Sequence, residues 1–255
     1  MSTFVHVEKI DMQSNTRKMI GEPVVVEVPV NIFVNNKFVT TLFALPKLKR
    51  ELALGWLFDE GILQSLDEIK EVVVNQSNVN VITKGPIKEE ALQAVGVAAC
   101  GSSINKFLMT ISKAVEQPVE SSYKVKAYDI IRFVKELDRS KLYRLTRGVH
   151  VAAIFESGKL VAFAEDIGRH NAVDKVIGIS IESRVNFSNS VLVSSGRQPA
   201  DMVLKTARMK IPIVVSIAAP IYSGIIAAEK TGVTLVCHAK SHQIRVYTHP
   251  YRILL

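Results

Sequence analysis

The chain has 255 residues, of which 48% are hydrophobic, and its formal net charge is +8 at pH 7. This composition excludes a largely disordered protein, and the presence of only two cysteines excludes a disulfide framework and a four-thiolate metal site. The positive charge favours an anionic partner, such as a nucleotide, a phosphate or a nucleic acid.

The N-terminal part of the chain is predicted to form a small α+β unit of ββαββ order. The turn signal Asn35-Asn36 predicts a hairpin, Pro29 places the first strand near a sheet edge, and Gly61 ends the helix. The alternating and helical spacings predict these elements at residues 24–34, 38–44, 47–60 (the helix), 68–74 and 78–83.

The rest of the chain alternates between strands and short helices, which predicts a mostly parallel sheet covered on both faces. Strands are expected at residues 149–156, 160–164, 190–194, 213–218, 234–237 and 245–248. Helices are expected at residues 104–115, 130–137, 171–183, 200–209 and 221–230. The fold class is therefore α/β, with residues 1–98 as a small N-terminal domain and residues 99–255 as an α/β domain.

The sequence lacks the signals of export or membrane insertion. The N-terminus has no basic stretch followed by an apolar core, and the uncharged residues 211–228 contain Pro212 and Pro220. This segment is better interpreted as a buried strand followed by a helix. We expect a cytoplasmic protein, with no membrane partner and with Cys100 and Cys237 unbridged.

Cys100 is the first candidate for chemistry. An isolated cysteine is more often a small buried side chain, but Gly101 follows Cys100, and Ser102 and Ser103 are able to cap the helix expected next. A thiol just before a helix N-terminus has a lowered pKa, which favours the nucleophilic thiolate. Cys237 ends a predicted buried strand and is expected to be structural.

Two strand-to-helix junctions carry polar side chains. Asp166, Arg169 and His170 crowd the first junction, and Gly196 and Arg197 follow the next strand. Ligands of α/β sheets bind beyond the carboxyl ends of the strands, and arginine suits phosphate recognition. The alternative is that the first group only caps and braces its junction. The second group is not a P-loop, because it has no Gly-Lys-Ser/Thr ending.

A basic segment near the C-terminus could bind phosphate or form a solvated hairpin. The segment consists of His238, Ala239, Lys240, Ser241, His242 and Gln243, with Arg245 close behind. The histidines of the chain match neither of the zinc motifs His-Glu-x-x-His and His-x-Glu with Pro-Cys-x-x-Cys, so no metal site is expected.

Taken in order, these motifs resemble those of the FdhD family of formate dehydrogenase accessory sulfurtransferases. The most specific stretch is residues 165–175, Glu-Asp-Ile-Gly-Arg-His-Asn-Ala-Val-Asp-Lys. The other matching segments are residues 51–62, 146–150, 195–197, 219–220 and 246–250.

The resemblance implies a sulfur carrier. A cysteine desulfurase transfers sulfur to Cys100 as a persulfide, and Cys100 passes it to the bis(molybdopterin guanine dinucleotide) form of the molybdenum cofactor for formate dehydrogenase. The family has a Cys-x-x-Cys motif, whereas here Ser103 replaces the second cysteine. That change excludes sulfur release by disulfide closure but leaves one persulfide anchor.

The resemblance also implies a homodimer with a cytidine-deaminase-like fold that lacks zinc. It places the guanine dinucleotide of the cofactor, or GDP, on residues 238–243, where Lys240 keeps part of the family's charge, with Gly196, Arg197, Asp166, Arg169 and His170 beside it.

Two other functions stay open. The missing second cysteine favours a chaperone that binds the cofactor without sulfur chemistry. The charge of +8 alone motivates a nucleic-acid-binding module, but no basic-aromatic stacking motif or DNA-binding pattern supports it. We therefore expect no nucleic-acid partner.

Overall fold

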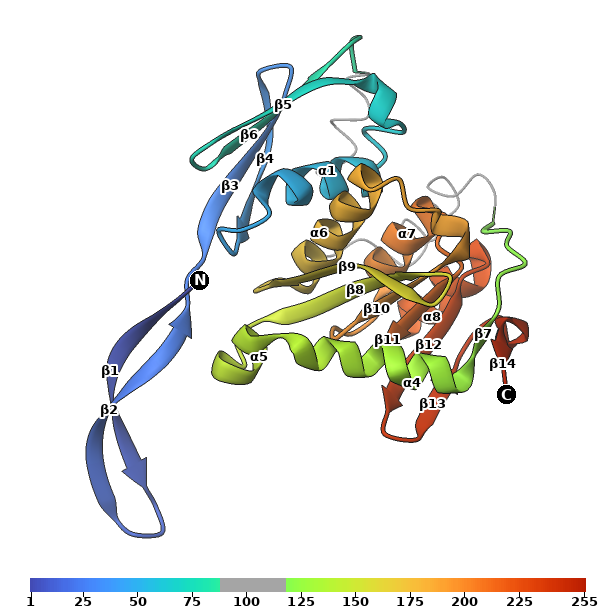
Figure 1. Ribbon diagram of the computed structural model, residues 1–255. Coiled ribbons are helices and arrows are strands. Elements are labelled where there is room, and N and C mark those ends of the chain that lie inside the picture. Colours follow the sequence, from blue (N-terminus) through green and yellow to red (C-terminus); the bar gives the residue numbers. More distant parts are fainter. Residues whose placement is uncertain (88–117) are drawn as a thin grey trace.

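The computed structural model describes residues 1–87 and 118–255. At its centre lies a six-stranded sheet in the order β13-β12-β11-β10-β8-β9 (Figure 1). The strands are β8 (His150–Glu156), β9 (Lys159–Asp166), β10 (Ser190–Ser194), β11 (Ile213–Ser216), β12 (Thr234–Lys240) and β13 (Gln243–Val246).

The sheet is mixed, so the prediction of a mostly parallel sheet is wrong. β10, β11 and β12 are parallel, whereas β8, β9 and β13 pair antiparallel with their neighbours. The reason is that two tight hairpins flank the parallel strands. Ser157 and Gly158 take the left-handed backbone conformation in one turn, and Ser241 takes it in the other.

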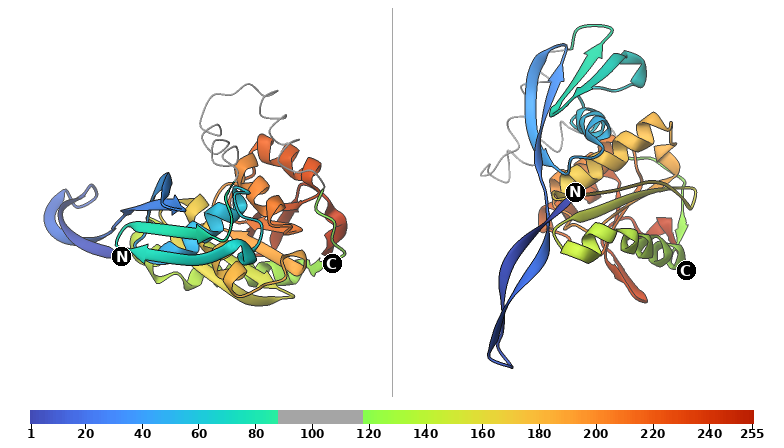
Figure 2. Two further views of the ribbon diagram at one scale, coloured as in Figure 1. Left: turned by 90° about the horizontal axis from the view of Figure 1, so that it is seen from above. Right: turned by 60° about the vertical axis from the view of Figure 1, so that its left-hand side comes forward.

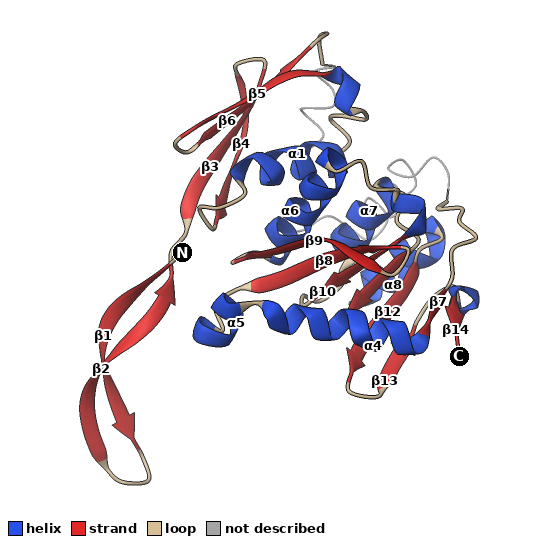
Figure 3. Cartoon of the chain, in the orientation of Figure 1, coloured by secondary structure: helices blue, strands red, loops and turns tan. Residues whose placement is uncertain are grey.

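Helices cover both faces of this sheet (Figure 3). Helices α6 (Arg169–Glu182), α7 (Ala200–Arg208) and α8 (Tyr222–Thr231) pack on one face, and α4 (Ala127–Lys135) packs on the other. The shorter elements are α5 (Lys141–Thr146), η3 (Glu136–Arg139), η4 (Phe187–Asn189), η5 (Pro250–Arg252), β7 (Val125–Lys126) and β14 (Ile253–Leu254). The predicted mixed α/β class is confirmed.

The predicted ββαββ unit is present as a four-stranded sheet of order β4-β3-β6-β5 with one helix. Its elements are β3 (Val28–Val34), β4 (Lys37–Ala44), α1 (Lys49–Asp59), η1 (Leu66–Glu68), β5 (Ile69–Asn75) and β6 (Asn78–Thr83). β3 lies next to the edge strand β4, so the position near a sheet edge predicted from Pro29 is confirmed, although β3 itself is an inner strand. Proline is tolerated there because the pairing of β3 with β6 begins only at Asn31.

The two parts of the chain share one apolar core through the contact between α1 and α6. A Cβ atom added to Gly55 would lie 1.7 Å from Asp174 O, and one added to Gly178 would lie 1.9 Å from Glu51 O. The two helix backbones therefore approach each other where neither has a side chain. The predicted domain boundary between residues 98 and 99, and the helix expected at 104–115, lie outside the described residues.

The prediction contained no element before residue 24, but the structure has a long hairpin there. β1 (Ser2–Asp11) pairs antiparallel with β2 (Thr16–Val25) along the whole length of both strands. This hairpin, called the arm below, projects away from the rest of the molecule (Figure 2). The single strand predicted at 24–34 is therefore split between β2 and β3.

Several boundaries also differ from the prediction. α6 begins at Arg169 after Gly168 rather than at Asn171, because the Asn171 side chain donates to Asp166 and to Phe43 O instead of capping a helix. α4 starts at Ala127, three residues before the predicted start, and α5 was not expected. The start of α6 therefore depends in part on a contact with a distant part of the chain, at Phe43.

Candidate functional site

The predicted site residues gather at one end of the strands of the six-stranded sheet. This end is called the site edge, or simply the edge, below. β9, β10, β11 and β12 end at this edge and β8 begins there, as their pairing requires. A chain of hydrogen bonds crosses it: Ser216 Oγ donates to Gly196 O at 2.6 Å, Ala218 N donates to Ser216 Oγ at 3.0 Å, and His238 N donates to Ala218 O at 3.1 Å. The edge is therefore one connected surface.

Gly196 lets the start of α6 approach the end of β10. A Cβ atom at Gly196 would lie 2.7 Å from Arg169 Cβ, which is closer than real Cβ contacts. Arg169 is therefore held over the loop after β10. Its Nε atom is buried and has no hydrogen-bond partner among the described residues. A buried donor without a partner is costly, and an anion in the site would satisfy it.

Other cationic and polar side chains surround Arg169. His170, next in α6, has its Nε2 atom 2.8 Å from Asp201 Oδ2. Arg197 is exposed and forms no ion pair with any residue in the described ranges. Partial burial would raise the pKa of Asp201, but the hydrogen bond and charge of His170 outweigh it and hold that pKa below its usual range. The structure thus brings Arg169, His170, Gly196 and Arg197 together, as predicted.

The sequence interpretation did not select His150 as a site residue, yet it belongs to this group. Burial lowers its pKa, and the nearby charges of Arg169, His170 and Arg197 lower it further. The imidazole is therefore neutral at neutral pH. The sequence signal was its place at the start of a predicted strand, which is too weak on its own to select a site residue.

Asp166 is at the same edge but faces the interior. Its carboxylate is fully buried, lies 2.6 Å from Lys175 Nζ, and accepts hydrogen bonds from the backbone N–H groups of Leu45 and Gly168 and from Asn171. All its contacts are internal, so the carboxylate is not available for direct contact with a ligand. It holds the β9–α6 junction and the loop after β4 in place. For Asp166 this agrees with the alternative interpretation of the sequence, in which the polar group only caps and braces its junction.

The C-terminal basic segment forms the end of β12 and its turn into β13. His238 and Ser241 take the left-handed conformation, with φ of 51° and 57°. Lys240, Ser241, His242 and Gln243 are exposed. The Ala239 side chain is buried in the core under α4 and therefore faces away from solvent. β12 lies two strands from β10 in the sheet, or about 10 Å. The segment thus flanks the cationic group at the same edge.

Of the two cysteines, Cys237 lies inside the molecule, whereas Cys100 and Ser103 lie outside the described residues. Cys237 is fully buried, and burial raises the pKa of its thiol to about 12. A thiol with this pKa forms almost no thiolate at neutral pH. Cys237 therefore has the environment of a structural cysteine.

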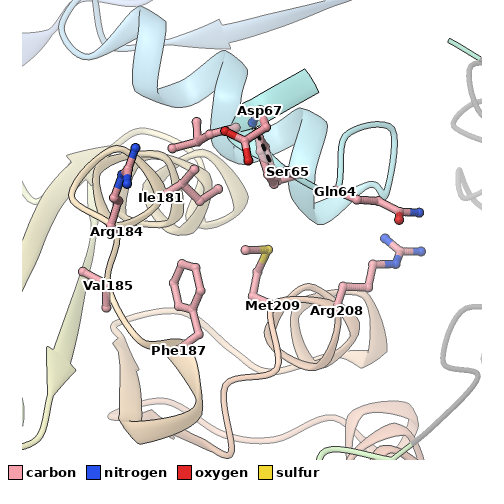
Figure 4. Close-up of a pocket in the computed structure, with 11 residues that line it drawn as sticks. Gln64, Ser65, Asp67, Ile181, Arg184, Val185, Phe187, Arg208 and Met209 are labelled. Carbon is pink, nitrogen blue, oxygen red and sulfur yellow. Dashed lines mark hydrogen bonds between the residues drawn. The ribbon is translucent and has the colours of Figure 1, made fainter. Parts of the chain in front are cut away.

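A separate cavity of about 450 Å³ lies at the opposite edge of the sheet (Figure 4). Phe187 and Met209, which precede β10 and β11, form part of its lining, together with Arg184 and Arg208. None of the predicted site residues that the structure describes contributes to it. Within the described ranges, no group of three metal-ligating side chains occurs, and no helix is long and apolar enough to cross a membrane.

The fold and this edge define a mixed α/β protein with a cationic site assembled from strand ends and the start of α6. The chain belongs to the FdhD/NarQ family, whose model matches residues 25–254.

Individual relatives agree with this assignment. A protein of Methanothermobacter thermautotrophicus named sulfur carrier protein FdhD is 34% identical over 256 residues and covers 100% of both chains. One of the same name from Sulfolobus acidocaldarius is 35% identical over 235 residues, 90% of each chain. A crystal structure of a Desulfotalea psychrophila protein, described as a formate dehydrogenase accessory protein, matches with a TM-score of 0.80, 30% identity and 99% coverage of both chains.

Proposed function

We propose that this protein is a sulfurtransferase that carries sulfur to the molybdenum cofactor in the cytoplasm. A cysteine desulfurase transfers sulfur to Cys100 as a persulfide, and Cys100 passes it to the bis(molybdopterin guanine dinucleotide) cofactor, which is the substrate. The sulfurated cofactor then enters formate dehydrogenase. The observation that carries the proposal is the family match over residues 25–254, together with relatives named sulfur carriers.

The cationic edge supports the second half of this proposal. Arg169 and Arg197 supply guanidinium groups suited to a pyrophosphate, and Arg169 has a buried donor that lacks a partner among the described residues. Lys240 and the exposed side chains around it extend the positive surface toward the guanine end of the dinucleotide or of GDP. His170 contacts the ligand, and Asp166 positions the junction. We also propose that this sheet and its helices have a cytidine-deaminase-like fold without zinc.

Sulfur loading of Cys100 tests the first half. After incubation with a cysteine desulfurase and cysteine, mass spectrometry of the intact protein and its peptides is expected to show added sulfur on Cys100 and none on Cys100→Ala. Cys237→Ala is the matched control and is expected to load like the wild type, because the Cys237 thiol is buried. Equal sulfur on wild type and Cys100→Ala would reject the carrier.

A chaperone without sulfur chemistry is the second candidate function, favoured by Ser103 in place of the second cysteine. It requires that Cys100→Ser supports full formate dehydrogenase maturation while guanine dinucleotide binding is unchanged. Loss of maturation with retained binding would eliminate it.

The arm supports a homodimer, which we propose as the assembly of this protein. An isolated two-stranded hairpin is at best marginally stable in water. On the arm, Phe4 is 69% exposed and Met19 64% exposed, and apolar side chains occur on both of its faces. Exposed apolar surface of this kind marks an interaction site. A second copy offers an identical arm, whose outer strand edges pair with no other strand in the described part of the chain.

Substitutions on the arm test the assembly. Phe4→Ser with Met19→Ser is expected to weaken the dimer by at least about tenfold, because both remove apolar contact area. Sedimentation velocity over a range of concentrations measures the change. Tyr128→Ser removes a side chain that is 80% exposed on α4 and serves as the control. An unchanged dimer in the arm variant, or a wild-type monomer at all concentrations, would contradict the proposal.

A further inference from the structure

The direction of the hydrogen bond between His150 and Ser195 depends on which nitrogen atoms of the His150 ring are protonated. His150 Nδ1 lies 3.2 Å from Ser195 Oγ, which also accepts a hydrogen bond from Val151 N at 2.9 Å. A serine hydroxyl has one proton to donate. In the Nε2–H tautomer, which we assign to neutral His150, the Nδ1 atom accepts that proton, so the one donor of the Ser195 hydroxyl is used within the protein.

Burial and nearby positive charges keep His150 neutral in the free protein. Burial lowers its pKa most, and the charges of Arg169 and His170 in α6 and of Arg197 in the loop after β10 lower it further. Asp166 is its partner across β9, but Lys175 already neutralises that carboxylate at 2.6 Å. Burial and three nearby basic groups therefore oppose a further positive charge, and no carboxylate contact with His150 offsets them among the described residues.

We propose that His150 is a further ligand-contacting residue, which takes up a proton from solvent when a phosphate-type dianion enters the site. This inference rests on the proposed cofactor site. The protonated Nδ1–H then donates to Ser195 Oγ, so that this oxygen accepts two hydrogen bonds. The Ser195 hydroxyl, which stays protonated, then no longer donates to His150 and instead donates its hydrogen bond to the anion. Proton uptake therefore adds one positive charge and one new donor to the site.

The arrangement explains why a site for a pyrophosphate group would contain a neutral imidazole. A dianion within about 4–6 Å favours the charged form of a base and raises its pKa by about 1–3 units. By linkage, the same dianion binds more tightly as the pH falls, by up to about tenfold for each pH unit while His150 titrates in the bound state only. The site would thus discriminate dianions from neutral ligands.

The test is an NMR titration of the histidine side chains of the full chain, with and without inorganic sulfate, pyrophosphate or GDP. We expect each anion to raise the midpoint of the His150 titration by about one unit or more. His6, which is exposed on the arm, serves as the internal control and is expected to titrate alike in both conditions. Tighter binding of GDP than of pyrophosphate would assign the anion to a nucleotide.

Two variants complete the test. For His150→Gln, the affinity for GDP is expected not to rise at low pH as it does in the wild type. For Ser195→Ala, GDP is expected to bind more weakly but still to raise the midpoint of the His150 titration. Binding of GDP with no shift of His150 would overturn this inference and leave the proposed function standing. If no anion binds to the wild type, both the inference and the proposed cofactor site are rejected.

Discussion

Gly55→Ala is expected to destabilise the protein by about 3 kcal/mol or more, as overpacking of a close contact does at its upper range. The added Cβ atom would lie 1.7 Å from Asp174 O and 2.9 Å from Gly178 N. Both are backbone atoms, so no side-chain rotation relieves the clash and the two helices must separate. Alanine has a helix propensity better by about 1 kcal/mol, which offsets only part of the loss.

Urea unfolding of the variants measures this effect. Gly178→Ala is expected to behave in the same way, because its Cβ atom would lie 1.9 Å from Glu51 O. Gly85→Ala is the control: it meets no described atom within 4 Å, and we expect a change within about 0.5 kcal/mol. If Gly55→Ala unfolded at the same urea concentration as Gly85→Ala, the close helix crossing would be incorrect.

Lys205→Met is expected to cost about 3–5 kcal/mol at neutral pH, because it leaves buried carboxylates without their cation. Lys205 Nζ lies 2.6 Å from Asp59 Oδ1, 3.1 Å from Asp174 Oδ1 and 3.4 Å from Glu60 Oε1. It joins α7 to α1 and α6. Although burial disfavours the ammonium, these three carboxylates outweigh it and raise the pKa of Lys205. Lys230→Met, at an exposed position on α8, is the control.

The pH dependence of stability follows from the same cluster. Burial, and then Asp174, raise the pKa of Asp59 well above its usual 3.8. The folded state therefore holds a proton on Asp59 at pH values where the unfolded chain has lost it. Stability is expected to fall as the pH rises from about 4 through the raised pKa of the folded state.

Asp59→Asn is expected to remove most of this fall and to cost far less than Lys205→Met. It leaves Asp174 and Glu60 opposite Lys205 and Arg208, with the amide oxygen still able to accept from Lys205. Unfolding free energies measured at a series of pH values check both statements. A pH profile of Asp59→Asn as steep as that of the wild type would show that another group carries the dependence.

Local patterns predicted much of the fold and the site. The short apolar runs at residues 190–194 and 213–218, and the helical spacing between them, indicated these strands and the helix between them within a few residues. The polar residues after those strands placed Arg169, His170, Gly196 and Arg197 at one edge, because parallel strands end together. These inferences need only the spacing of hydrophobic residues along the chain and the types of residue at each strand-to-helix junction.

Other features required the tertiary structure, because they depend on partners far away in the sequence. Asp166 looked like a ligand residue until its pairing with Lys175 and its contact with Leu45 N showed an internal role. The arm was missed because its apolar side chains lie on both faces and define no single buried side. Sequence patterns alone did not select His150 as a site residue. Its place in the site became evident only from its hydrogen bond to Ser195 and from the cationic side chains that the fold brings near it.

The sequence by itself determined the mixed α/β class, the family, and the residue types at the strand ends, because these depend on local order along the chain. Only the tertiary structure decided which charges are used inside the molecule and which remain for a ligand. The physical reason is that burial and pairing set the ionisation of a side chain and its availability, and both arise when distant segments come together.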